Sequence, residues 1–150
     1  MTLDVRDSLR EIVREALSAL LGPDTPLADT VANADAAVYE ARVVLTGASQ
    51  GLMSVRVTPG LARTLAAAML GCRADQVTDA DIRDAVAELA SVTSANVKSL
   101  FPGPSDLALP ATVVGPGVTA RSGLGGTVAE VAFATGGKDL TVARLELRLP

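Results

Sequence analysis

A long amphipathic helix over residues 78–99 constrains the fold of this chain most strongly. At about 100° per residue, one face of the segment TDADIRDAVAELASVTSANVKS collects the apolar side chains. These are Ile82, Val86, Leu89, Thr93 and, just beyond the segment, Leu100, with Ala85, Asn96 and Val97 beside them. The opposite face carries Asp84, Glu88, Ser91, Ala95 and Lys98. Thr78 is predicted to cap the helix, and Asp79 and Asp81 place negative charge where the helix dipole favours it. The pattern therefore predicts one buried side and one exposed side, and we call Asp84, Glu88, Ser91 and Lys98 the polar stripe.

The flanking segments predict two further helices and an antiparallel sheet. Apolar residues at helical spacing predict a helix over residues 3–21, which Gly22 and Pro23 terminate. A short buried helix is expected over residues 59–71, where Pro stands at the start and Gly at the end. Alternating patterns predict strands at residues 39–45, 53–57, 111–114, 127–135 and 140–149, the first two forming a hairpin. The mixture indicates an α+β fold with about five to six antiparallel strands, one face covered by two long helices and a short one and the other face wet.

Length and composition indicate one globular domain over residues 1–150. Hydrophobic residues make up 49% of the chain and charged residues 20%, so it can bury a core without a cofactor. A net charge of −4 without a basic cluster argues against a nucleic-acid partner. The chain has no His and only Cys72, which argues against a zinc or transition-metal site. No signal peptide and no run of about 18 apolar residues is present, so a cytoplasmic protein without a membrane segment is expected.

Two glycine-bearing motifs carry no catalytic prediction. Residues 47–51 spell G-x-S-x-G, but they join two predicted strands in a chain that has no His to accept the Ser proton, so a turn is expected. The glycines of residues 123–126 lack the G-K-[ST] ending of a phosphate loop and lead into a strand. Asp106 and Asp139 are expected to be isolated loop residues that form no hydrolytic pair.

The segment DAVAELASVTSANVKS, residues 84–99, resembles the active-site helix of the CheC/CheX/FliY chemotaxis phosphatases, most closely that of CheX. In that family an Asp or Ser, a Glu and an Asn share one exposed helical face. Asp84 and Glu88 match the first two positions, and Ser91 stands where the pattern has Asn. Pro110, in the run SDLALP, loosely matches a Pro that the family places after the motif. The first helix lacks a second Glu-x-x-Asn motif, which fits the single-site CheX branch.

The resemblance implies a CheX-like fold and a phosphatase acting on the aspartyl phosphate of a CheY-like response regulator. Such a regulator carries its own Mg²⁺ and Lys, so this chain would need no cofactor of its own. Glu88 would pair with that Lys, Ser91 would occupy the place of the carboxamide that aligns the attacking water, and Asp84 and Lys98 would join the contact. Homodimerisation through sheet edges is also implied, and the strand at 140–149 offers an unprotected edge. The alternative is a CheX-like module without catalytic activity that binds a receiver domain or dimerises.

Overall fold

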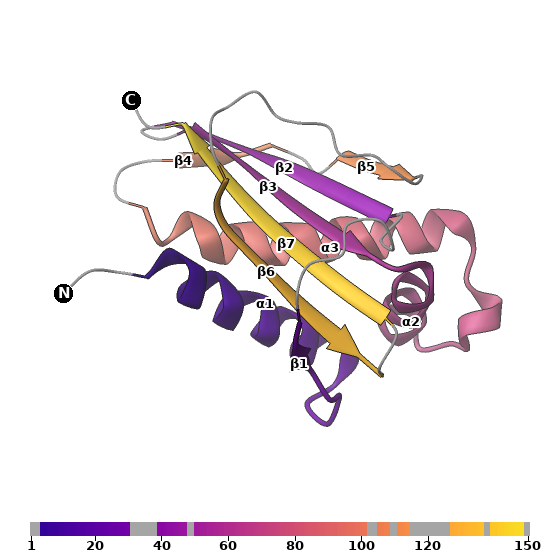
Figure 1. Ribbon diagram of the computed structural model, residues 1–150. Helices are drawn as coiled ribbons and strands as arrows, with labels where there is room; N and C mark the ends of the chain where they lie inside the picture. The colour runs from indigo at the N-terminus through magenta and orange to yellow at the C-terminus, as the bar shows by residue number, and fades with distance from the viewer. Residues whose placement is uncertain are drawn as a thin grey trace.

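The computed structural model describes residues 4–30, 39–47, 50–101, 105–108, 111–114, 127–136 and 139–148. The described helices are α1 (Val5–Leu21), α2 (Pro59–Leu70), the 3-10 helix η1 (Ala74–Gln76) and α3 (Asp79–Lys98). The described strands are β1 (Ala28–Asp29), β2 (Tyr39–Gly47), β3 (Gln50–Val57), β4 (Ser105–Leu107), β5 (Ala111–Val114), β6 (Thr127–Thr135) and β7 (Asp139–Arg148), all labelled in Figure 1. Pro110, residues 48–49 and residues 123–126 lie outside the described residues.

The strands form one antiparallel sheet, which confirms the predicted α+β class. Its order is β1-β6-β7-β3-β2-β4, and β5 pairs with β2 as well (Figure 1). The predicted hairpin is confirmed, because β2 pairs with β3 with Tyr39 opposite Val57 and Leu45 opposite Gly51. Strands β1 and β4 were not predicted, since segments of two and three residues are too short to show an alternating pattern.

The C-terminal strand lies inside the sheet. β7 pairs with β3 on one side and with β6 on the other. The expectation that residues 140–149 offer an unprotected edge is therefore wrong for the described part of this strand. The alternation of Leu and charged residues predicts the strand but not its neighbours, because edge and central strands of a sheet with one charged face share the same period.

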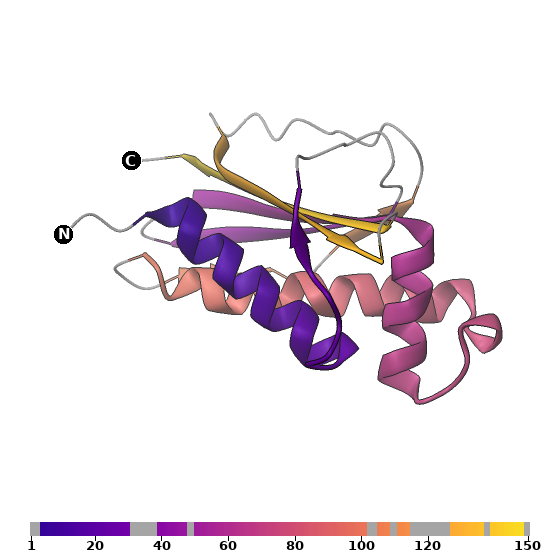
Figure 2. The same ribbon diagram turned by 60° about the horizontal axis from the view of Figure 1, so that its bottom comes forward.

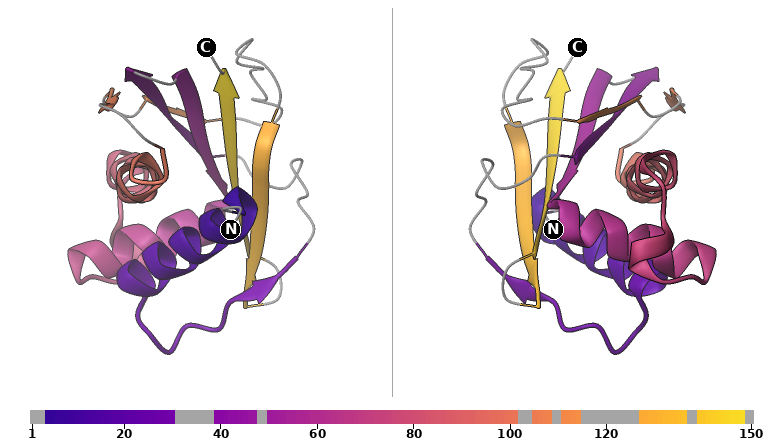
Figure 3. Two further views of the ribbon diagram at one scale, coloured as in Figure 1. Left: turned by 90° about the vertical axis from the view of Figure 1, so that its left-hand side faces the viewer. Right: turned by 90° about the vertical axis from the view of Figure 1, so that its right-hand side faces the viewer.

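The three α-helices pack on one face of the sheet, as Figures 2 and 3 show. Between them and the sheet lies a core made mainly of Leu, Val and Ala, with Phe133 as its largest fully buried side chain. Helix α3 contacts β2 and β3 beneath it and both α1 and α2 beside it. The sheet and both neighbouring helices therefore fix the position of α3.

The opposite face of the sheet carries charge, as predicted, but it is less wet than predicted. Glu40 and Arg56, directly opposite each other on β2 and β3, are each 5% exposed, and Arg56 Nε lies 3.5 Å from Glu40 Oε1. Arg144 on β7 donates to Glu130 on β6 at 2.8 Å. Their opposite charges on neighbouring strands allow Glu40 and Arg56 to be buried together, whereas Arg144 and Glu130 stay half-buried.

Helix α1 begins two residues later than predicted. The Asp4 carboxylate accepts the backbone N–H groups of Arg6 at 3.0 Å and Asp7 at 3.3 Å, so Asp4 is the N-cap and Val5 is the first helical residue. These two hydrogen bonds lower the pKa of Asp4 because they favour its charged carboxylate, and the bond from the Asp7 N–H has the larger effect. The end at Gly22, which has φ 109°, is as predicted.

Helix α2 is attached to the start of β7 through Thr58 and Asp139. The Thr58 hydroxyl donates to Asp139 Oδ1 at 2.9 Å and accepts the Leu140 N–H at 3.1 Å. Gly60 allows this close approach, since a Cβ at that position would lie 2.7 Å from Asp139 Oδ1. Asp139 is therefore the first residue of β7 and is bonded to Thr58, the N-cap of α2, and Asp106 lies in β4, so the prediction that both are isolated loop residues is wrong.

Candidate functional site

The N-terminus of α3 is capped and attached to the sheet. Thr78 Oγ1 accepts the Asp81 N–H at 3.1 Å, and Asp81 Oδ2 accepts the Thr78 N–H at 2.8 Å, which confirms the predicted cap. Tyr39 on β2 donates its hydroxyl proton to Asp79 at 3.3 Å, and Arg83 donates to the same carboxylate at 2.8 Å. Burial, and after it the Asp79 carboxylate, raise the pKa of Tyr39.

The buried face of α3 agrees with the predicted apolar face and adds small polar residues to it. Its buried residues are Ile82, Ala85, Val86, Leu89, Ala90, Thr93, Ser94 and Val97. Thr93 is fully buried, and its hydroxyl is satisfied there because it donates to the Leu89 carbonyl at 2.7 Å. Asn96, which was expected beside the core face, is exposed, and its side-chain nitrogen donates to the Val92 carbonyl at 2.9 Å.

The polar stripe faces solvent along α3. Asp84, Glu88 and Lys98 are exposed, and Ser91 is half-buried. Within the part of the chain that the structure describes, none of these four side chains makes a hydrogen bond or an ion pair. The side chains of Asp84, Glu88 and Ser91 can therefore bind a partner without first breaking a hydrogen bond or an ion pair within the described residues.

The spacing along the stripe brings its first three members onto one ridge. Glu88 follows Asp84 by four residues, and Ser91 follows Glu88 by three, which are the separations of neighbouring side chains on a helix. The rise of 1.5 Å per residue puts Asp84 and Ser91 about 10 Å apart along the axis. A single partner surface can therefore contact all three residues at once.

Helix α2 is less buried than the sequence predicted. Met69 and Leu70 at its C-terminal end are 41% and 56% exposed, and they line a pocket beside Asp84 on α3. Sequence reasoning did not single out these two residues, because an apolar helix between Pro and Gly is typical of a core element. Helix α2 has few polar residues to mark its outer face, so only its packing against α3 shows which end reaches solvent.

The described residues contain neither a metal-binding cluster nor a spanning helix. No group of three His, Cys, Asp or Glu side chains lies close enough there to hold one metal ion. No described helix combines the length and the hydrophobicity needed to cross a membrane.

The family model for the chemotaxis phosphatase CheX matches residues 39–134, more than half of the chain. The chain belongs to the CheX family. The matched region begins with β2, contains the whole of α3 and ends within β6. It therefore includes every residue of the polar stripe. A search of curated protein sequences finds no match.

Solved structures of CheX proteins share this fold. The chemotaxis protein CheX from Vibrio vulnificus is 20% identical, with a TM-score of 0.76, over 96% of this chain and 97% of that one. The CheX–CheY–BeF3–Mg²⁺ complex from Borrelia burgdorferi contains a chain that is 14% identical, with a TM-score of 0.74, over 98% of this chain and 99% of that one. CheX from Desulfovibrio desulfuricans is 22% identical, with a TM-score of 0.71 and coverage of 97% and 99%. These similarities confirm the CheX-like fold predicted from the sequence.

Proposed function

We propose that this CheX-family chain binds the phosphorylated receiver domain of a CheY-like response regulator on the polar stripe of α3 and hydrolyses its aspartyl phosphate. One observation carries the proposal: in a member of this family, the exposed Glu88 and the half-buried Ser91 lie one turn apart on the outer face of α3 and have no bonding partner within the described residues. The Borrelia burgdorferi neighbour, whose crystal structure holds CheX with CheY, supports the choice of partner.

In this reaction water attacks the phosphorus and the bond between phosphorus and the aspartyl oxygen breaks. The products are inorganic phosphate and the free Asp carboxylate of the receiver, which supplies its own Mg²⁺ and Lys to neutralise the phosphoryl oxygens. Glu88 accepts hydrogen bonds from that Lys, which fixes the orientation of the two proteins. Ser91 can orient the water, since a hydroxyl both accepts and donates a hydrogen bond. Catalysis of this kind depends on position more than on covalent chemistry.

The length of the Ser91 side chain limits the expected rate. A Ser hydroxyl ends one branch short of the carboxamide that an Asn would supply at the same position. A displacement of about 1 Å in a positioning group can cost on the order of a hundredfold in rate. We therefore expect slow hydrolysis together with full docking, because Asp84 and Glu88 are retained.

The experiment compares decay of the aspartyl phosphate with and without the protein. CheY-like receiver domains of the source organism are phosphorylated with acetyl phosphate and freed of excess donor. We expect this chain to accelerate decay for at least one receiver, and Glu88→Gln to abolish the acceleration. Glu11→Gln is the matched control, because Glu11 is an exposed acid on α1 that is followed three residues later by Arg14 and not by a hydroxyl. Equal decay with and without the protein for every receiver would reject the catalytic proposal.

The half-buried position of Ser91 favours one alternative, a receiver-binding or dimerising module without activity. Binding of a receiver without any acceleration of decay would support this alternative. Ser91→Asn tests it further, since activity that appears only in this variant would identify a phosphatase scaffold that lacks its water-orienting group. Self-association through a sheet edge is measured separately, as molar mass by light scattering, and a homodimer is the result we expect.

A further inference from the structure

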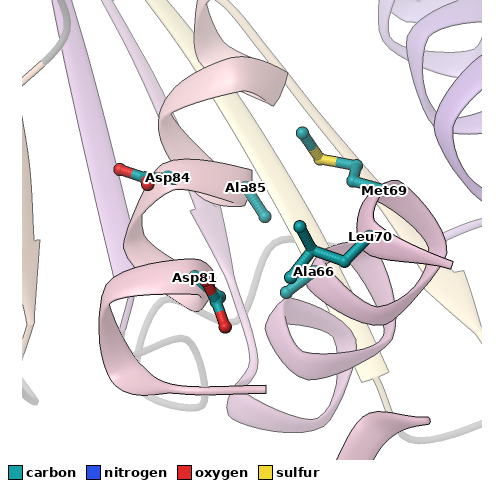
Figure 4. A pocket seen from close by; sticks show the side chains of 6 residues that line it. All are labelled: Ala66, Met69, Leu70, Asp81, Asp84 and Ala85. Carbon is teal, nitrogen blue, oxygen red and sulfur yellow. The ribbon is translucent and has the colours of Figure 1, made fainter. Parts of the chain in front are cut away.

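A small pocket opens between α2 and α3 beside the polar stripe (Figure 4). Its walls are Ala66, Met69 and Leu70 on α2 and Asp81, Asp84 and Ala85 on α3. Each helix contributes positions i, i+3 and i+4, so one ridge of each helix faces the other. Figure 4 shows Leu70 and Met69 on one side of the gap and Ala85 and Asp81 on the other, with Asp84 on the same turn of α3 and its carboxylate directed away from the gap.

The wall on α2 is apolar and open to solvent. Only Met69, Leu70 and Val44 are strongly exposed among the large hydrophobic residues that the structure describes, and the first two adjoin each other here. Met69 and Leu70 belong to a helix with an ordered C-terminal end, because Gly71 adopts the left-handed conformation and its N–H donates to the Ala67 carbonyl. Fraying of the helix therefore does not account for their exposure. Together, these adjoining apolar side chains offer a partner a small apolar surface to cover at the mouth of the pocket.

The size of the pocket decides what kind of group can enter. Its volume is about 70 Å³, whereas sites for metabolites and cofactors have about 300–1,000 Å³. The pocket therefore suits a single side chain of another protein.

The charge of the rim decides which side chain. Asp81, whose Oδ2 already accepts the Thr78 N–H, is one of the residues that line the pocket. Asp84 is exposed and has no hydrogen-bond or ion-pair partner among the described residues. An apolar wall on α2 opposite a turn of α3 that carries two Asp residues matches a Lys or Arg side chain, whose methylene stem packs on Met69 and Leu70 while its cation extends to the acids of α3.

We propose that the α2–α3 pocket receives a Lys or Arg side chain from the surface of the receiver domain and thereby selects which receiver docks. The proposal rests on the docking role given above to the polar stripe. Asp84 belongs both to the pocket and to the stripe, and it lies about 6 Å along the helix axis from Glu88. An interface buries about 800 Å² on each partner, so one receiver face covers both places.

The test measures the dissociation constant for a purified receiver domain loaded with beryllofluoride and Mg²⁺. We expect Leu70→Ser and Asp84→Asn each to weaken binding about tenfold, because each removes one of the two interactions of the inserted side chain. The loss caused by Asp84→Asn should shrink as salt is raised, whereas that caused by Leu70→Ser should persist. Val44→Ser is the matched control, since Val44 is 43% exposed on β2 and lies outside the pocket.

The outcomes separate the two proposals. If the wild type binds a receiver and Glu88→Gln weakens that binding while Leu70→Ser does not, the pocket has no role and the docking role stands. If the wild type binds none of the organism's CheY-like receivers, the docking role itself fails. A loss with Leu70→Ser but none with Asp84→Asn would overturn the basic side chain as the occupant. If the inference is right, one alanine substitution among the Lys and Arg residues of the receiver should have an effect on the dissociation constant that is non-additive with the effect of Leu70→Ser. If no such substitution exists, the inference is refuted.

Discussion

Replacing Gly60 by Ala should destabilise this protein, although the same change in most helices is stabilising. The added Cβ would lie 2.7 Å and 3.1 Å from the two carboxylate oxygens of Asp139, so the carboxylate must move. Movement breaks the 2.9 Å hydrogen bond from the Thr58 hydroxyl. A bond of this kind to a charged acceptor contributes about 1.5–3 kcal/mol, and Ala returns about 0.5–1 kcal/mol in helix propensity. We expect a net loss of about 1–2 kcal/mol in the free energy of unfolding.

Urea denaturation followed by circular dichroism measures this loss, and the midpoint should fall without a change of slope. The control is Gly60→Ala in a chain that already carries Asp139→Ala, where no carboxylate remains to be displaced. There the sign should reverse, with a gain of up to about 1 kcal/mol. A stabilisation of the same size in both backgrounds would refute the steric reasoning, because the clash would then have no energetic consequence.

Three further predictions concern the N-terminal ends of two helices and the proposed catalytic position. Thr78→Ala should lower the free energy of unfolding by about 1 kcal/mol, because the Asp81 N–H loses its acceptor, while Thr78→Ser should retain most of it in the same urea titration. The folded-state pKa of Asp4 is lowered, so its stabilising contribution is present above the unfolded pKa of about 3.9 and is lost as pH falls through the folded value. Asp4→Ala should therefore reduce stability at pH 7 more than at pH 2, as measured by thermal midpoints at the two pH values. Ser91→Asn should raise the rate of receiver dephosphorylation by about a hundredfold and leave receiver affinity within a few fold, as single-turnover decay and equilibrium binding would show.

The sequence predicts the helices and the main strands of this fold because each has a strong period or clear end signals. The apolar positions of α3, its Thr78 cap and its outward acids all follow from the 3.6-residue repeat, and the structure places them as expected. The exposure of Glu88 follows from the same repeat. Such predictions succeed where a local segment contains both the periodic pattern of apolar residues and the residues that begin and end the helix or strand.

Features that depend on contacts between distant segments could not be predicted. Three such features involve residues that are far apart in the sequence. They are the central position of β7 in the sheet, the hydrogen bond between Thr58 and Asp139, and the exposure of Leu70 beside α3. The outward exposure of Asn96 is a different case. It lies at the border of the apolar face, where a small rotation of the helix on the sheet decides between burial and exposure.

In the function proposed above, the packing of α3 prevents a shift of the helix from compensating for the shorter side chain of Ser91. Leu89, Ala90 and Thr93, which surround Ser91 in sequence, are each 0% exposed, and α3 contacts the sheet and two helices. Moving this turn toward a partner by about 1 Å would open a cavity behind it, at about 24 cal/mol for each Å³. Under the proposed function, a receiver that requires a longer side chain at this position is therefore expected to be dephosphorylated slowly or to supply the missing group itself. We therefore expect substitution at residue 91 to alter the proposed hydrolysis without disturbing the exposed acids on the preceding two turns, so that docking and hydrolysis are separated by a single side chain.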